Sequence, residues 1–394
     1  MAILLSDAGL HTRLLPLTFT RPVGELRPGI LTHSAKWRLL TGLPVCHLTE
    51  PFLQGKFPPV QADRVLEVHG GVLPTEALAA AVLDLEPGQV LLGANGPLAF
   101  CLEGAAHTTA MDWTDPPAFL GQVHFHGPIE VIERPWHLFQ RCGAAITDDV
   151  ALLTKGRQSA PLSPTNTVIG DPAAIFLEEG AKVEASILNT TGGPIWIGKD
   201  AEVMEGCMVR GPFALGEGAQ LKMGAKVYGP SSFGPECRVG GEVNNSVILG
   251  YSNKGHDGFL GNSVLGEWCN LGADTNTSNL KNTYGEVKAW SYADKALMAT
   301  GQQFLGLVMG DHSKCGINTM FNTGTVAGVC ANVFGSGFPP KHIPSFAWGE
   351  GATYTLEKAL ETCERVMQRR HVALTAADKE VLAHVFEVTE PYRG

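Results

Sequence analysis

Residues 197–239 read IGKDAEVMEGCMVRGPFALGEGAQLKMGAKVYGPSSFGPECRV and place an apolar residue at every sixth position. A second track, four positions later in each step, holds mostly small residues, and both tracks return over residues 309–333. A period of six fits neither a helix nor an alternating strand, so it predicts a coiled parallel β-solenoid. The first track consists of Ile197, Val203, Val209, Leu215, Leu221, Val227, Phe233 and Val239, and then of Met309, Cys315, Phe321, Ala327 and Val333.

Glycine often occupies the second slot of the six-residue step, as at Gly198, Gly216 and Gly234. Sharp corners between flat faces need unusual backbone angles, so we expect these glycines to form the corners. Three flat faces make a coil of about 18 residues that contacts only its neighbouring coils. We expect such a solenoid over residues 165–350.

The six-residue rhythm is interrupted at Gly250–Gly261 and again at Ser278–Leu307. Insertions in solenoids usually project as loops on one face, which is often the functional face. We therefore expect both segments to project from the coil and to mark the active site.

Residues 1–132 are interpreted as a mixed α/β domain, and residues 133–164 as a helical linker. Pro74 and the Pro87–Gly88 pair delimit elements within the first of these segments. The predicted strands are Ala2–Ser6, Arg64–Val68 and Gln89–Leu92, and the predicted helices are Leu31–Leu40, Thr75–Leu83 and, in the linker, the short Glu133–Gly143.

Residues 351–394 return to helical spacing. Apolar residues over Thr355–Arg370 recur at intervals typical of a helix, and Thr375–Asp378 resembles a capping box before a second helix. Because a solenoid needs its open end covered, these helices are interpreted as a cap.

The composition limits the partners of the chain. Its 394 residues carry a formal net charge of -10, which disfavours nucleic acid, a partner that requires a basic stripe. The nine cysteines include no C-x-x-C pair, so they are interpreted as small buried residues. No signal peptide and no stretch of ~20 apolar residues is found, so we expect a soluble, cytoplasmic protein without a membrane partner.

The hexad pattern, with an apolar residue, glycine and a small residue at fixed slots, resembles the hexapeptide-repeat acyltransferases. That resemblance implies a left-handed parallel β-helix and a homotrimer. It also implies acetyl-CoA as the cosubstrate.

The interrupted region sharpens the resemblance. Residues 250–261 read GYSNKGHDGFLG and residues 265–279 read LGEWCNLGADTNTSN. This is similar to the acetyltransferase half of the bifunctional bacterial enzyme that makes UDP-N-acetylglucosamine, whose pattern is K-A-x-H-L-x-Y-x-G-D followed by N-I-G-A-G-x-x-x-x-N. The resemblance implies His256 as general base, Lys254 on the sugar phosphate, and Asn270 and Asn279 at the sugar and acyl site. Phe259 replaces the tyrosine of the family, so a hydroxyl is lost.

The chemistry of acetyl transfer agrees with this assignment. Transfer to an amine needs a base near neutral pH, and histidine has a suitable pKa. It also needs a donor for the developing oxyanion, which a backbone N–H of a rigid coil supplies. A close histidine pair with metal-ligand spacing is missing, so no metal site is expected.

Residues 4–22, LLSDAGLHTRLLPLTFTRP, resemble the sugar nucleotidyltransferase signature G-x-G-T-R-L-x-P-L-T. Gly9, Thr12 and Arg13 are the expected phosphate contacts, because such a strand-to-loop segment cradles phosphates. His11 replaces a glycine, and the lysine of the family is replaced by a valine, for which Arg21 is the candidate substitute. The aspartate that binds Mg²⁺ in the family has no counterpart. Three interpretations stay open: a variant transferase using Mg²⁺, a domain that binds nucleotide without chemistry, and a structural relic.

Taken over nearly its full length, the chain resembles the alternative, Bacteroidetes-type branch of these bifunctional proteins. We therefore predict acetyl transfer from acetyl-CoA to an amino sugar phosphate, glucosamine-1-phosphate first among them. The N-terminal domain adds binding of UTP or dTTP and a sugar-1-phosphate. Two alternatives stay open: acetylation of a nucleotide-linked amino sugar, and a non-catalytic sugar-nucleotide-binding or regulatory protein.

Overall fold

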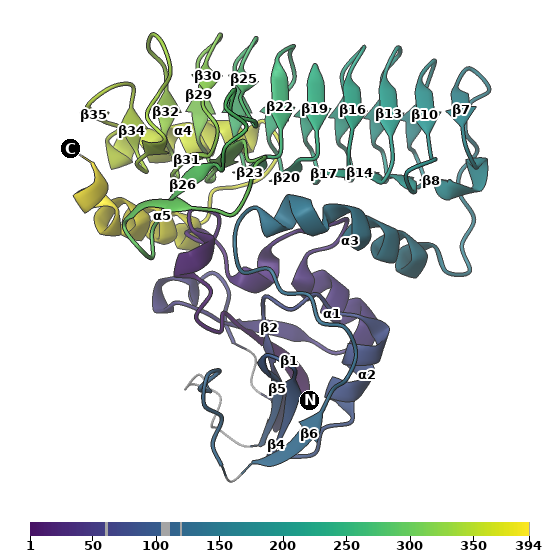
Figure 1. The fold of residues 1–394 in the computed structure, drawn as a ribbon, viewed down its shortest axis with the longest axis vertical. Coiled ribbons are helices and arrows are strands. Elements are labelled where there is room, and N and C mark those ends of the chain that lie inside the picture. The colour runs from purple at the N-terminus through teal and green to yellow at the C-terminus, as the bar shows by residue number, and fades with distance from the viewer. Residues whose placement is uncertain (60–61, 104–110, 119, 394) are drawn as a thin grey trace. The chain divides into compact units, whose positions relative to one another are not determined.

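The computed structural model describes residues 1–59, 62–103, 111–118 and 120–393 (Figure 1). It divides into two compact units. The first unit consists of Met1–Leu14, Thr18–Leu26 and Leu31–Arg134, and the second of Leu15–Leu17, Arg27–Ile30 and Pro135–Gly394.

The first unit is built on a mixed sheet with the strand order β2-β1-β3-β5-β4-β6. Strands β2, β1 and β3 are parallel, whereas β5 is antiparallel to both β3 and β4. Apolar side chains of the sheet and of its two helices form the core of this unit. The elements are β1 (Ala2–Ser6), α1 (His33–Thr41), β2 (Val45–Leu48), β3 (Arg64–His69), α2 (Glu76–Leu83), β4 (Gln89–Gly93), β5 (Gly96–Glu103) and β6 (Gly121–His124).

The mixed α/β prediction for this unit is confirmed. The predicted strands and helices all form, with ends shifted by two residues at most. No pattern in the sequence predicts β2 or β5. Strand β2 has only four residues, two of them half-buried, so its alternation is too short to stand out from the sequence.

The second unit contains the predicted parallel β-solenoid, whose coils stack along one axis (Figure 1). Its strands form three ladders. The first ladder holds β7 (Thr167–Ile169), β10 (Ile187–Asn189), β13 (Met208–Arg210), β16 (Lys226–Tyr228), β19 (Glu242–Asn244) and β22 (Phe259–Gly261). The second holds β8 (Ile175–Leu177), β11 (Ile195–Ile197), β14 (Phe213–Leu215), β17 (Ser231–Phe233), β20 (Val247–Gly250), β23 (Val264–Glu267), β28 (Leu307–Met309), β31 (Thr325–Ala327) and β33 (His342–Ile343). The third holds β9 (Lys182–Val183), β12 (Glu202–Val203), β15 (Gln220–Leu221), β18 (Arg238–Val239), β21 (Asn253–Lys254), β24 (Asn270–Leu271), β29 (Lys314–Cys315), β32 (Asn332–Val333), β34 (Ala347–Trp348) and β35 (Ala352–Thr353), and a separate pair joins β25 (Asn276–Thr277) to β30 (Met320–Phe321).

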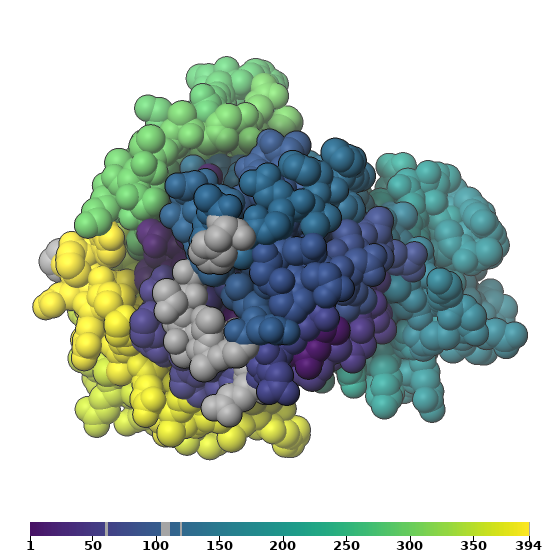
Figure 2. All heavy atoms as spheres, turned by 90° about the horizontal axis from the view of Figure 1, so that it is seen from below, coloured from purple at the N-terminus to yellow at the C-terminus, as the bar shows by residue number. Residues whose placement is uncertain are grey.

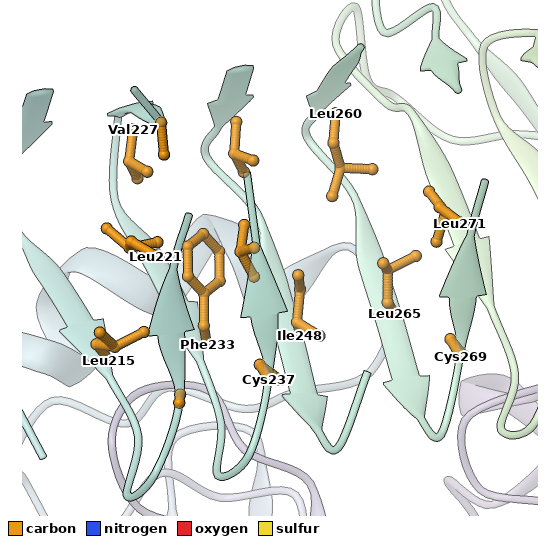
Figure 3. Close-up of a cluster of buried hydrophobic side chains, with 14 of the residues drawn as sticks. Leu215, Leu221, Val227, Phe233, Cys237, Ile248, Leu260, Leu265, Cys269 and Leu271 are labelled. Carbon is orange, nitrogen blue, oxygen red and sulfur yellow. The ribbon is translucent and has the colours of Figure 1, made fainter. Parts of the chain in front are cut away.

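Both sequence tracks point into the coil. Every residue of the first track is buried, and so are the small residues of the second track, including Ala201, Cys207 and Cys237. Figure 3 shows the apolar side chains of successive coils stacked along the interior. The period of six therefore reflects which side chains pack in the interior of the coil, and it explains why the solenoid cysteines are buried.

The second-slot glycines lie in the corners between strands, but without the unusual backbone angles that we expected there. Gly198, Gly216 and Gly234 have no left-handed φ. A Cβ at Gly234 would lie 1.9 Å from the Leu249 carbonyl oxygen, so glycine allows close approach between coils here. The left-handed angles occur two residues later, as at Asp200 with φ of 56°.

The segment Gly250–Gly261 does not project as a loop, which corrects a second expectation. Its strands β20, β21 and β22 stay in the three ladders. Val239 pairs with Lys254 and Glu242 pairs with Phe259, so the coil is shortened by a few residues rather than interrupted by an insertion. The rhythm of six breaks because residues are missing from the coil.

The segment Ser278–Leu307 does leave the coil. It contains an antiparallel hairpin of β26 (Lys288–Ser291) and β27 (Ala296–Ala299). Strand β28 then resumes the ladder directly beside β23. Residues of this segment form a green projecting lobe in Figure 2.

Helices flank the solenoid within the second unit. Helix α3 (His137–Thr154) has 18 residues, longer than the predicted Glu133–Gly143, and packs on β14, β17 and β20. Helices α4 (Leu356–Gln368) and α5 (Ala376–Val388) form the C-terminal tail, and the predicted capping box at Thr375–Asp378 is present. Single-turn 3₁₀ helices complete the described elements: η1 (Thr12–Leu14), η2 (Val23–Glu25), η3 (Pro51–Leu53), η5 (Pro172–Ala174) and η6 (Glu390–Tyr392).

Within the described residues, none of the helices combines the length and the apolar character needed to cross a membrane.

Candidate functional site

Lys254 occupies a core-facing position of the third ladder. Its register partner is Val239, a residue of the apolar track, and Lys254 itself is 2% exposed. Its Nζ donates to the carbonyl oxygen of His256 at 2.6 Å. Burial lowers the pKa of Lys254 to about 8, against the opposite effect of Asp257 and Asp274. Lys254 thus fastens the turn that carries His256, and its amine is turned away from any ligand outside the coil.

His256 is exposed on the turn between β21 and β22. It lines a cavity of about 630 Å³ together with Asn270, which belongs to β24. Asn253 donates to the Asn270 side-chain oxygen at 3.4 Å and accepts from Arg370 at 3.1 Å. The structure therefore brings two of the predicted site residues, His256 and Asn270, to one cavity.

Phe259 and Asn279 lie together elsewhere on the coil. A Cβ at Gly261 would approach both side chains, at 2.5 Å from Phe259 Cζ and 2.6 Å from Asn279 Nδ2. The Asn279 amide donates to Asn262 Oδ1 at 2.8 Å. Neither Phe259 nor Asn279 lines the cavity of His256. Within one subunit, the five predicted residues thus separate into a cavity pair, a second pair beside Gly261, and the buried lysine.

The cavity of His256 is strongly cationic. The described residues that line it contain no carboxylate, whereas Lys222, Arg238, Lys314, Arg369 and Arg370 all contribute to it. No sequence motif marks these five cations. Two of them could have been found from the register: Arg238 and Lys314 share one row of the third ladder with Asn253 and Asn270, each one residue before a core position.

In the first unit, the signature loop exposes the expected phosphate contacts. Gly9 has a left-handed φ of +74°, and both Gly9 and Thr12 are exposed. Arg13 is half-buried, with Nη1 at 4.0 Å from Glu133 Oε1. His11, which replaces a glycine of the signature, is buried at 7% exposure with its ring edge against Phe52. Its side chain is therefore turned inward and leaves the exposed face of the loop open.

Arg21, the candidate substitute for the missing lysine, lies in the interior. It is 4% exposed. Burial raises the pKa of the nearby Glu25, but His47, Ser34 and Arg21 together hold that pKa below its ordinary value. His47 Nε2 lies 2.8 Å from Glu25 Oε1. Arg21 thus belongs to a buried charge network rather than to the exposed loop.

The described residues of the first unit do not fit a resident Mg²⁺ ion. Asp7 accepts from the Val23 N–H at 2.8 Å and from Thr49 Oγ1 at 2.5 Å, so it holds the loop. Glu67, on β3, is fully buried, and burial raises its pKa to about 7. Mg²⁺ binds through ionised carboxylates, and in this part of the chain no cluster of three acidic, histidine or cysteine side chains occurs.

Comparisons with known proteins relate parts of this chain to sugar nucleotidyl transferases and to bifunctional proteins. Residues 2–158 match the family described as sugar nucleotidyl transferase. The bifunctional protein GlmU of Methanocaldococcus jannaschii is 34% identical over 87 residues, which cover 22% of this chain and 21% of that protein. Over the matched stretch, the chain is similar to the GlmU-like bifunctional proteins. The predicted resemblance to these proteins is thereby confirmed, whereas its assignment to the Bacteroidetes-type branch stays a prediction.

Another GlmU-like relative is the bifunctional sugar-1-phosphate nucleotidylyltransferase/acetyltransferase of Sulfurisphaera tokodaii, 33% identical over 93 residues, or 24% of this chain and 23% of that protein. The chain thus spans about a fifth of the length of each of these curated relatives. The solved UDP-N-acetylglucosamine acyltransferase of Arabidopsis aligns with 60% of this chain and 97% of its own, at 12% identity and a TM-score of 0.19.

Proposed function

We propose that the solenoid transfers an acetyl group from acetyl-CoA to the amine of an amino sugar phosphate, with glucosamine-1-phosphate as the first acceptor to test. The observation that carries this proposal is the exposed His256 in a cavity lined by five cationic side chains. A base beside a cationic cavity suits an acceptor that bears both an amine and a phosphate. The name of the Sulfurisphaera tokodaii relative, a bifunctional sugar-1-phosphate nucleotidylyltransferase/acetyltransferase, supports the same reaction.

His256 acts as the general base. The acceptor amine attacks the thioester carbonyl carbon, a new C–N bond forms, and His256 takes the proton that the nitrogen loses. The C–S bond then breaks, and the protonated histidine returns that proton to the departing thiolate. Asn270 orients the acceptor beside the base. Side-chain hydrogen bonds from Arg370 to Asn253 and from Asn253 to Asn270 hold the Asn270 side chain in place.

Thiol release from acetyl-CoA in the presence of glucosamine-1-phosphate tests this role. His256→Ala should lower turnover by about 10²–10⁴-fold while the fold is unchanged, because general-base catalysis contributes that much. His124→Ala, which removes an exposed histidine of the first unit, is the control and should keep full turnover. Unchanged turnover in His256→Ala contradicts the assignment.

For the first unit we propose binding of UTP or dTTP and a sugar-1-phosphate at the exposed loop of Gly9, Thr12 and Arg13. The family match over residues 2–158 supports this, and so does the inward position of His11. Titration calorimetry with each nucleotide, with and without Mg²⁺, tests binding, and pyrophosphate release tests chemistry. Arg13→Ala should weaken nucleotide binding about tenfold, and an absence of binding in the unaltered protein overturns the proposal.

A second acceptor class has its own support. Five cations exceed what one phosphate monoester needs, so a nucleotide-linked amino sugar, which carries a diphosphate, is the alternative substrate.

We further propose a homotrimer, in which a neighbouring subunit brings its own side chains to the site. Exposed apolar side chains on neighbouring strands, Ile187 at 40% and Met208 at 45%, support an interface between subunits. Light scattering on the protein eluted from a size-exclusion column measures its molar mass, which decides whether the chain forms a trimer.

A further inference from the structure

We propose that the end of helix α4 belongs to the substrate site, where Arg369 and Arg370 bind phosphate groups together with Lys222, Arg238 and Lys314. The C-terminal helices were interpreted above as a cap of the solenoid. Both arginines, however, line the cavity of His256. The ligand class is a phosphate ester or diphosphate, which is the chemistry that the acceptor and CoA share. The proposal rests on the proposed function only in placing the reacting amine beside this cluster.

The cations are held at the cavity by named contacts. Arg370 donates to Asn253 Oδ1 at 3.1 Å, on the same ladder row as Asn270. Lys314 donates to the carbonyl oxygen of His312 at 2.7 Å. Lys222 donates to Gln220 at 2.8 Å, and Glu202 compensates part of its charge. These contacts orient the side chains before a ligand arrives, which lowers the cost of binding.

A second acidic residue, Glu236, compensates a further part of the charge. Glu236 Oε2 lies 3.0 Å from Arg238 Nη2 and 3.7 Å from Arg370 Nε. Burial lowers the pKa of Lys222, and the charges of Arg238 and Arg370 lower it further against the opposite effect of Glu202. An anion with two or more charges would relieve the remaining repulsion, since Glu202 and Glu236 are fewer than the cations they face.

The cationic cluster also supplies the phosphate-binding charge that Lys254 does not supply. Lys254 was expected to bind the sugar phosphate, yet its amine is held inside the coil by the His256 carbonyl. A cavity of about 630 Å³ is of the size that holds a small ligand, and it brings phosphate-binding cations and the exposed base together. The two guanidinium groups that directly follow α4 therefore take the role that the sequence pattern assigns to a lysine.

Titration of the full-length protein with inorganic pyrophosphate, CoA and glucosamine-1-phosphate tests the proposal. Arg369→Ala and the double variant with Arg370→Ala should weaken pyrophosphate binding by about tenfold and a hundredfold, and added salt should reduce the affinity of the unaltered protein. The control Arg365→Ala removes an exposed arginine of the same helix that pairs with Glu361, and it should bind as the unaltered protein does. Because Arg369 is exposed, its variant stays informative even if the double variant loses stability.

The three ligands separate the sources of the phosphate. Weaker binding of glucosamine-1-phosphate alone assigns the cluster to the acceptor, and weaker binding of CoA alone assigns it to the cosubstrate. Undiminished binding of all three ligands by the Arg369 and double variants overturns the proposal. A protein that binds phosphates through Arg369 and Arg370 but releases no thiol from acetyl-CoA contradicts the proposed function and leaves this inference standing.

Discussion

At the scale of single residues, Lys254 shows how register decides the role of a side chain. A lysine near a histidine suggests a phosphate ligand, but the coil before it is shortened, and this shift places Lys254 opposite Val239. A buried amine is tolerated here because it donates to a backbone carbonyl, at 2.6 Å, and lies near two aspartates. The sequence holds the lysine that the family pattern predicts, but its side chain points into the coil and not toward a ligand.

Replacing Lys254 distinguishes a role as anchor of the His256 turn from a role as phosphate ligand. Lys254→Met should lower kcat about tenfold with little change in KM for the sugar phosphate, because the turn of His256 loses its anchor while the phosphate-binding cations remain. Steady-state kinetics of thiol release measure both constants. A large rise in KM at constant kcat would instead make Lys254 a phosphate ligand, as the sequence pattern implies.

At the scale of elements, the solenoid turns have two different requirements for glycine. Slots that face the next coil need glycine because the backbone of that coil is close, whereas the left-handed slot accepts Asp200, Trp268 or His312 as well as glycine. Left-handed angles cost a non-glycine residue of order 1–3 kcal/mol, and the neighbouring coils hold them in place. Close approach of the neighbouring coil therefore restricts a position to glycine more strictly than a left-handed φ does.

The two glycines that flank His256 provide a matched test. A Cβ at Gly258 would lie 2.1 Å from the Thr275 carbonyl oxygen at a φ of +110°, whereas the nearest atom to a Cβ at Gly255 is 4.0 Å away. Gly258→Ala should therefore lower the free energy of unfolding by more than about 2 kcal/mol, and Gly255→Ala by less than about 1 kcal/mol. Denaturant unfolding measures both values. Equal losses would show that the close approach of coils at Gly258 is not rigid.

At the scale of the whole molecule, the chain has two units with separate cores, and a buried carboxyl group makes the stability of the first unit depend on pH. Glu67 in the first unit has a pKa raised by burial to about 7, above its ordinary 4.5. Between these values the folded state holds a proton that the unfolded state has lost, so the stability of this unit falls as pH rises from about 4.5 to 7. The loss reaches about 3 kcal/mol above pH 7.

Removing this carboxyl group should remove that pH dependence. Glu67→Gln should raise the unfolding temperature of the first unit at pH 8 and change it little at pH 4, because glutamine resembles the protonated acid. Differential scanning calorimetry at both pH values measures it, with the transition of the second unit as an internal reference. A variant that is destabilised at pH 8 would show that Glu67 is ionised and needed in the folded state.

The sequence alone determined the architecture, because a period of six has one common structural solution and because the tracks record which side chains are buried. The same holds for β1, the two helices of the first unit and the capping box at Thr375, which all depend on local signals. The tertiary structure alone decided which residues share the cavity. Coil register turned Lys254 inward, and α4 brought Arg369 and Arg370 to His256 across more than a hundred residues of chain. Such long-range contacts leave no periodic trace in the sequence.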